Sequence, residues 1–183
     1  MRRNAKHLYD MSLCALFAAF LCIISPFSVP LGPIPLSLGL FGVLLAGVVL
    51  GPVKGFVSVT LYLLLGICGL PVFGGAQGGV GVIVGPTGGF LWGYLLTVLI
   101  VGILFPLAKT CQKSPLLIAV FCFAGTLLCD LCGVLQYMAV AKVSFAAALI
   151  VCFYPFVLID LAKCLLVGFF GGRLREILGK IGK

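Results

Sequence analysis

The sequence predicts an all-α membrane protein with six transmembrane helices and both termini on the cytoplasmic side. Of the 183 residues, 63% are hydrophobic and only 9% are charged, whereas a soluble domain is about 25% charged. A water-soluble fold of this length could not bury so much apolar surface. Apolar stretches also recur as far as the C-terminus, which indicates that the lipid bilayer is the solvent. We therefore expect residues 1–183 to form a single, multi-pass integral membrane domain of the cell membrane.

The number of helices follows from the length of the apolar segments. A spanning helix needs roughly 20 apolar residues. The chain divides into such segments at about 8–25, 36–50, 55–68, 88–107, 115–140 and 145–172. The second and third segments are short for a full span, so we expect them to tilt little or to borrow residues from the adjoining loops. A basic stretch precedes the first segment, but no small-residue cleavage site follows it, and we expect this helix to be retained.

Membrane orientation explains the net charge of +8 without a nucleic-acid partner. Basic residues concentrate in the cytoplasmic loops of membrane proteins. With the N-terminus inside, the residues assigned to the cytoplasmic side are Arg2, Arg3, Lys6, Lys54, Lys109, Lys113, Arg173, Arg175, Lys180 and Lys183. Lys142 falls outside, and Lys163 lies within the sixth apolar segment. We thus expect membrane lipid, and no nucleic acid, around this chain.

The cysteines favour neither a disulfide framework nor a metal site. They number nine, an odd count, and lie mostly within the apolar segments. Cys129 and Cys132 enclose Asp130, but the single histidine is His7 near the N-terminus, so a zinc ion would find few ligands. We expect no metal and no cofactor.

An extracellular glycine-rich loop is expected at residues 69–87, between the third and fourth helices. The stretch from Gly69 to Gly89 has nine glycines and no charged residue. Glycine lets a backbone pass close to a ligand, and irregular backbone at membrane depth is tolerated only where protein buries it or water reaches it. Apolar residues such as Phe73 and Ile83 favour a loop that folds back over the bundle.

Three charged residues are expected at mid-membrane, well inside the apolar segments: Asp130, Asp160 and Lys163. A charge at mid-membrane costs roughly 2.5–3.5 kcal/mol on insertion scales, so each is a functional candidate. Asp160 and Lys163 are three residues apart and therefore share one side of a helix. Two interpretations are open: the pair only neutralises itself within the membrane, or it offers an anion and a cation to a polar ligand.

Four stretches of the chain carry a family resemblance. They are Leu-Leu-Ala-Gly-x-x-Leu-Gly-Pro at 44–52, Leu-Tyr-Leu-Leu-Leu-Gly-x-x-Gly-Leu-Pro-Val-Phe at 61–73, Gly-x-Gly-x-x-x-Gly-Pro-Thr-Gly-Gly-Phe at 79–90 and Asp-x-x-Lys at 160–163. With them the chain resembles the BioY family, the biotin-binding S components of energy-coupling factor (ECF) transporters, over nearly its whole length. One stretch alone is a weak match, whereas the four together, at this spacing, are specific.

The resemblance implies an S-component fold with six helices and cytoplasmic termini. It implies that biotin binds from outside, under the loop between the third and fourth helices. It also implies that Ala15 and Ala19 form the motif by which the first helix contacts a transmembrane coupling subunit, with two cytoplasmic ATPases completing the ECF module. The sequence has no Walker motif and no nucleophile–base pair, so we expect a binding protein rather than an enzyme, with no catalytic residues.

The expected site follows the chemistry of biotin, which has a ureido ring, an apolar sulfur ring and a carboxylate. We expect Asp160 to accept from a ureido N–H and Lys163 to donate to the carboxylate or the ureido carbonyl. Further contacts are expected from Gln77, the loop backbone at Gly81 and Gly85, Asp130, and Tyr62, Trp92 or Tyr94 over the sulfur ring. The chain departs from the family at Gly39, where many members carry Gln, and the polar position of the glycine-rich loop is Gln77.

Three alternatives remain open at this point. An S component for another vitamin, such as thiamine or riboflavin, would share the topology but would favour aromatic stacking, and this sequence has one tryptophan. A solitary transporter would use Asp130, Asp160 and Lys163 as a proton relay, and its uptake would need no ATPase. A membrane enzyme would need a catalytic constellation that the sequence does not contain.

Overall fold

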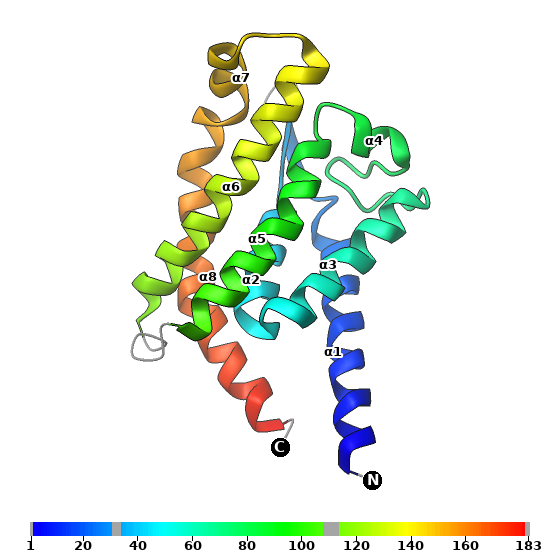
Figure 1. The fold of residues 1–183 in the computed structure, drawn as a ribbon, viewed down its shortest axis with the longest axis vertical. Helices are drawn as coiled ribbons and strands as arrows, with labels where there is room; N and C mark the ends of the chain where they lie inside the picture. The colour runs from blue at the N-terminus through cyan, green and yellow to red at the C-terminus, as the bar shows by residue number, and fades with distance from the viewer. Residues whose placement is uncertain (1, 31–33, 108–113, 182–183) are drawn as a thin grey trace.

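The computed structural model describes residues 2–30, 34–107 and 114–181 and is mostly helical. Over these residues the elements are α1 (Arg2–Ile24), β1 (Ser28–Pro30), β2 (Pro35–Ser37), α2 (Gly39–Leu50), α3 (Pro52–Ile67), α4 (Val80–Val84), α5 (Gly88–Leu107), α6 (Pro115–Ala141), α7 (Phe145–Cys152) and α8 (Tyr154–Ile181). The long helices run side by side along the longest axis of the molecule (Figure 1). The first residues of α1 and the last residues of α8 lie at one end of the bundle, and α4, α7 and the strands lie toward the other.

Four of the described helices, α1, α5, α6 and α8, are long and apolar enough to cross a membrane. The apolar helices α2 and α3 have 12 and 16 residues, which correspond to about 18 and 24 Å at about 1.5 Å per residue. A typical hydrocarbon core is about 30 Å thick. The expected count of six spans and the cytoplasmic location of both termini therefore stay predictions.

Part of the expected charge distribution lies outside the described residues. This applies to Lys109, Lys113 and Lys183, and to the side chains of Arg2, Arg3 and Lys6. The side chains of Lys54, Arg173, Arg175 and Lys180 are described. Their sidedness also stays a prediction.

The expectation of an all-α chain is wrong between α1 and α2. Strands β1 and β2 form an antiparallel hairpin in which Val29 faces Leu36, and residues expected at the start of the second helix belong to β2. Pro30 pairs with Pro35 at the end of this hairpin. Proline is unfavourable inside a helix and is tolerated in edge strands, so this proline-rich connection leaves α2 to begin at Gly39.

The expectation of one helix at 145–172 is also wrong. α7 ends at Cys152 and α8 begins at Tyr154, with Pro155 in its first turn. In a continuous helix the ring of Pro155 would collide with the carbonyl of Val151, so the helix is interrupted at Phe153. α8 then continues past 172 to Ile181, and α1 begins at Arg2 rather than near residue 8.

Small residues bring α5 and α6 close together. A Cβ atom on Gly93 of α5 would lie 2.8 Å from Cα of Cys129 on α6, and one on Gly89 would overlap the carbonyl oxygen of Cys132. Such close approach is the usual basis of helix packing in lipid, where the hydrophobic effect between helices is absent. It places the first turns of α5 directly against the middle of α6.

Candidate functional site

A pocket lies among the hairpin, the glycine-rich loop and the facing parts of α2, α5, α6 and α8. Its empty volume, with the open solvent at its mouth included, is about 610 Å³. The lining residues are Ile34, Pro35, Ser37, Leu40, Phe73, Gly74, Val82, Thr87, Phe90, Leu91, Tyr94, Cys129, Asp130, Phe156, Asp160 and Lys163. Most of them are apolar or aromatic, with a few polar groups, which is the usual make-up of a ligand pocket.

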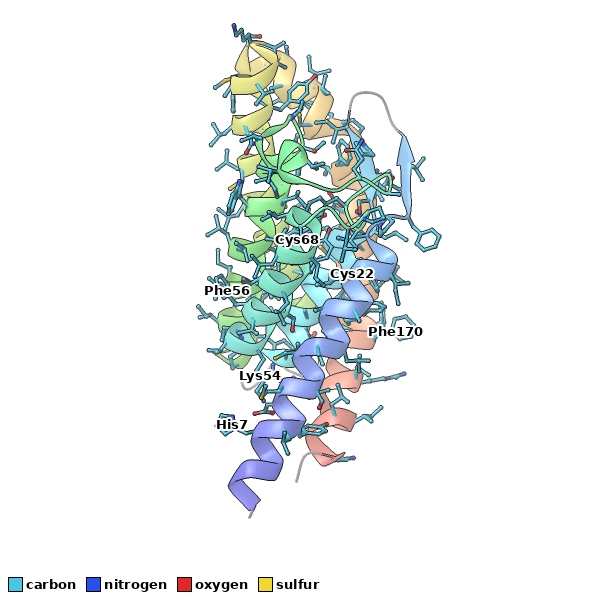
Figure 2. The ribbon with its side chains drawn as sticks, turned by 90° about the vertical axis from the view of Figure 1, so that its right-hand side faces the viewer. His7, Cys22, Lys54, Phe56, Cys68 and Phe170 are labelled. Carbon is cyan, nitrogen blue, oxygen red and sulfur yellow. The ribbon has the colours of Figure 1, made fainter. Side chains whose placement is uncertain are left out.

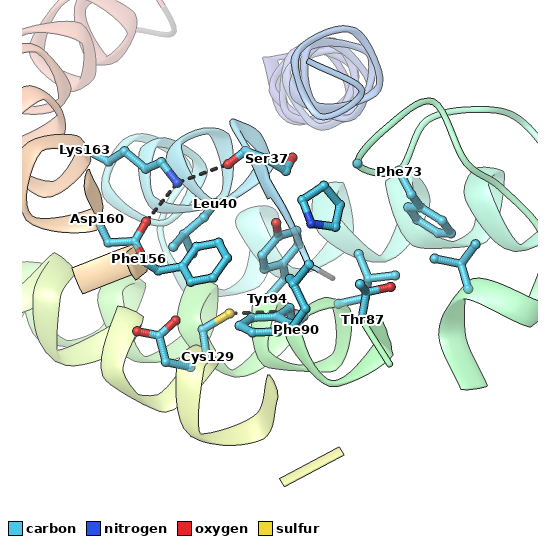
Figure 3. Close-up of a pocket in the computed structure, with 16 residues that line it drawn as sticks. Ser37, Leu40, Phe73, Thr87, Phe90, Tyr94, Cys129, Phe156, Asp160 and Lys163 are labelled. Atoms are coloured by element: carbon cyan, nitrogen blue, oxygen red, sulfur yellow. Dashed lines mark hydrogen bonds and ion pairs between the residues drawn. The ribbon is translucent and has the colours of Figure 1, made fainter. Parts of the chain in front are cut away.

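Asp160 and Lys163 form a buried ion pair in this pocket (Figure 3). Nζ of Lys163 lies 2.8 Å from Oδ1 of Asp160, and their side chains are only 7% and 3% exposed. Lys163 also donates to the backbone carbonyl of Ser37 at 3.0 Å. An ammonium group has three donors, so after these two bonds one N–H is available to a ligand. The second oxygen of Asp160 accepts no hydrogen bond from the described residues, and is available as an acceptor.

Asp130 and Tyr94 bring two more polar groups to the same pocket. Asp130 on α6 is 3% exposed and Tyr94 on α5 is 5% exposed. Within the described part of the chain, no group donates a hydrogen bond to Asp130. Because Asp130 lines the pocket, its carboxyl group is suited to a ligand that carries N–H or O–H donors. Four of the residues predicted from the sequence thus line one pocket: Asp130, Asp160, Lys163 and Tyr94.

The sequence model of the BioY family matches residues 1–180. This chain belongs to the BioY family. It is 36% identical over 182 residues to biotin transporter BioY2 of Lactococcus lactis subsp. cremoris (strain MG1363), which covers 99% of this chain and 97% of that protein. It is 34% identical over 169 residues to biotin transporter BioY of Thermotoga maritima, which covers 88% and 93% of the two chains.

A solved structure has the same fold as this BioY family member. It is the crystal structure at 2.1 Å of the S-component for biotin from an ECF-type ABC transporter. The TM-score is 0.88 at 28% sequence identity, and the match covers 94% of each chain. The S-component fold expected from the sequence is therefore shared with this structure. The biotin transporter relatives and the four membrane-length apolar helices of the described residues together indicate a multi-pass protein of the cell membrane.

In this BioY protein, Tyr62 lies behind the pocket rather than among its lining residues. Its ring is fully buried, and its hydroxyl lies 2.7 Å from Oγ of Ser25 at the end of α1. Ser25 also accepts at its backbone oxygen from the hydroxyl of Ser37, at 2.7 Å. Tyr62 therefore supports the hairpin residue whose carbonyl holds Lys163.

The same network explains why glycine, and no larger residue, fits at position 39. A Cβ atom on Gly39 would lie 2.5 Å from Oγ of Ser25 and 3.0 Å from the hydroxyl of Tyr94. The space that a larger residue would fill at this position is already taken by two hydroxyl groups. Gly39 instead donates its backbone N–H to Oγ of Ser37, at 2.9 Å.

The remaining predicted residues do not line the pocket. Gln77 and Gly81 are exposed in the loop, and Gly85 is half-buried. Trp92 is 49% exposed on α5. The loop itself does reach the pocket, through Phe73, Gly74, Val82 and Thr87. A direct role of Gln77, Gly81 or Gly85 in binding stays a prediction.

Several lining residues were not singled out from the sequence. Phe156 precedes Asp160 by four residues, and Phe90 precedes Tyr94 by four, so helical spacing from the predicted polar residues could have found both. Phe90 fits because Gly133 on α6 has no side chain there, as a Cβ atom would overlap the ring. Ser37 contributes through its backbone carbonyl, which no sequence pattern marks.

Proposed function

We propose that this chain captures biotin outside the cell and acts as the substrate-binding S component of an ECF-type transporter. The observation that carries this proposal is the buried Asp160–Lys163 pair in an apolar pocket under the glycine-rich loop. A buried ion pair often makes the free energy of folding less favourable than apolar residues of the same size would. Binding of a ligand that needs both charges accounts for the presence of this pair. The relatives that cover nearly all of this chain are named biotin transporters.

The polar groups of the pocket complement those of biotin. Asp160 accepts from a ureido N–H, and the free N–H of Lys163 donates to the ureido carbonyl or the carboxylate. Asp130 offers a further acceptor in the same pocket. The rings of Phe73, Phe90 and Tyr94 supply the apolar walls that the sulfur ring requires.

We further propose that α1, α2, α3, α5, α6 and α8 are the six spans and that both termini are cytoplasmic. The position of the α1 start and the α8 end at one end of the bundle supports an even number of crossings (Figure 1). Arg173, Arg175 and Lys180 lie near that end, on the last turns of α8, in agreement with the preference of basic residues for the cytoplasm. The pocket then opens toward the outside.

The transmembrane coupling subunit is proposed to contact α1 at Ala15 and Ala19. Both alanines are exposed, and α1 lies in front of the other helices when viewed from its own side (Figure 2). Only 28% of its apolar stretch His7–Ile24 is buried, compared with 56% for Gly88–Pro106 of α5. Small residues on an exposed face allow close approach of a partner helix. Two cytoplasmic ATPases would then drive transport.

Uptake of labelled biotin by cells that lack their own biotin transporter tests this function. We expect accumulation when the chain is produced with an ECF coupling subunit and its ATPases, and a loss of at least about tenfold when the ATPases carry inactive Walker motifs. Undiminished uptake without working ATPases would instead support a solitary transporter with a proton relay.

A variant with Ala15→Trp and Ala19→Trp provides the control for the partner surface. We expect this variant to lose uptake in the complete system, because the two indole rings hold the partner helix away. Its biotin affinity after purification should equal that of the unmodified chain, since neither alanine lies at the pocket. Normal uptake by this variant would contradict the proposed contact.

A further inference from the structure

Gln136 on α6 holds the part of the glycine-rich loop that contains α4. Its amide nitrogen donates to the carbonyl oxygens of Ile83 and Gly85, both at 2.8 Å. Only the NH₂ group of the amide can donate twice, so the two carbonyls fix the orientation of this side chain. The carbonyls at the end of a helix lack partners within the helix. Gln136 donates to both of these carbonyls, and that of Gly85 also accepts from the backbone N–H of Gly88, at 3.1 Å.

The other half of the loop is fastened to α3 by a buried ring. Phe73 is 1% exposed and contacts Tyr62 edge to face, with ring centroids 5.6 Å apart. Its ring occupies the place that a side chain at Gly66 would take. The backbone N–H of Gly79 also donates to the carbonyl of Gly66, at 2.7 Å. The loop is thus attached to α3 and to α6, and the backbone N–H of Gly75 also donates to the carbonyl of Pro26 after α1, at 3.3 Å.

The attachment to α6 lies beside the loop residues that cover the pocket. Val82 and Thr87 both line the pocket, and the two carbonyls held by Gln136 lie between them in the sequence. α4 has only five residues, too few for a helix to be stable by itself. The two hydrogen bonds from Gln136 therefore hold the backbone between Val82 and Thr87 against α6.

We propose that Gln136 is a positioning residue that holds α4 closed over the bound ligand and so sets the rate at which the ligand leaves. This proposal rests on the proposed function for the identity of the ligand. Gln136 itself does not line the pocket. Gln136 therefore makes no direct contact with the ligand and acts by keeping the loop closed. Its loss should mainly raise the rate at which the ligand dissociates.

Two variants separate this role from general packing. Gln136→Met keeps the length of the side chain but removes both donors, and Gln136→Glu keeps its shape but presents oxygen atoms to two carbonyls. With two hydrogen bonds lost, we expect koff for biotin to rise about tenfold in the methionine variant and further in the glutamate variant. We expect kon to stay the same or rise. Leu135→Met, at the neighbouring exposed position, is the matched control and should leave both rate constants unchanged.

Hydrogen exchange of the ligand-free protein supplies a readout that does not depend on biotin. Amides of residues 80–88 should exchange about tenfold faster in Gln136→Met than in the unmodified chain, while those of α3 stay the same. Unchanged loop exchange, or faster loop exchange with unchanged koff, would overturn the proposal. If the unmodified chain binds no biotin, the proposed function fails, and the exchange experiment still decides whether Gln136 holds the loop.

Discussion

Replacing Lys163 with methionine is expected to weaken biotin binding by at least about 30-fold. The substitution removes the donor that faces the ligand and leaves the carboxylate of Asp160 buried without its partner. Truncating one member of a buried, hydrogen-bonded charge pair costs about 2–5 kcal/mol, and each 1.4 kcal/mol is about tenfold in affinity. Equilibrium binding to the purified variant measures this loss.

The chain offers a matched control in its second lysine–aspartate pair. Lys54 on α3 pairs with Asp10 on α1, and these side chains are 39% and 27% exposed. Partly exposed pairs contribute about 0–1 kcal/mol, and neither residue lines the pocket. Lys54→Met should therefore bind biotin as the unmodified chain does.

A variant with both Asp160→Asn and Lys163→Met separates recognition from folding. It contains no unpaired charge at these positions, so it should fold at least as well as Lys163→Met. We expect it to be folded and still unable to bind biotin tightly. Affinity within about threefold of the unmodified chain, in either Lys163 variant, would contradict the proposed site.

Replacing Gly66 with valine is expected to weaken biotin binding by about 10- to 100-fold. A Cβ atom at this position would overlap the ring of Phe73, lying within 2.7 Å of all three of its nearest carbon atoms. Overpacking of this kind costs about 1–3 kcal/mol. We expect the loop to shift rather than α3. The ring of Phe73 is then displaced, and the pocket loses the lining that this ring provides. Biotin titration of the purified variant gives the size of the effect.

A double-mutant cycle with Phe73→Leu tests this explanation. Leucine is shorter than phenylalanine and leaves room for a side chain at position 66, so Gly66→Val should cost less in the Phe73→Leu background. Residues in direct contact usually show coupling of about 0.5–3 kcal/mol. If the two effects add without coupling, the overlap with Phe73 is not the cause of the weaker binding.

Hydropathy locates the helices of this chain well where they are long and uninterrupted. The predicted range 88–107 coincides with α5, and 115–140 differs from α6 by one residue. The hairpin was missed because each strand has three residues, too few for an alternating pattern to be recognised. Pro155 lies at the interruption between α7 and α8. Because the residues on both sides of it are apolar, hydropathy alone predicts one continuous segment there.

The charged part of the site could be predicted because charge is rare in a membrane. Asp130, Asp160 and Lys163 stood out for that reason alone, and all three line one pocket. Ser37 and Gln136 could not be found in this way. Ser37 holds Lys163 through a backbone carbonyl, which every residue type has. Gln136 contacts carbonyls more than 50 positions earlier in the chain, and only the folded structure brings them together.

The most direct test of the central claim is a calorimetric titration of the purified, detergent-solubilised chain with biotin, beside titrations with thiamine and riboflavin. We predict one saturable biotin site per chain and no saturable binding of the other two vitamins. A folded protein that binds no biotin, or that binds thiamine or riboflavin as tightly, would contradict the claim.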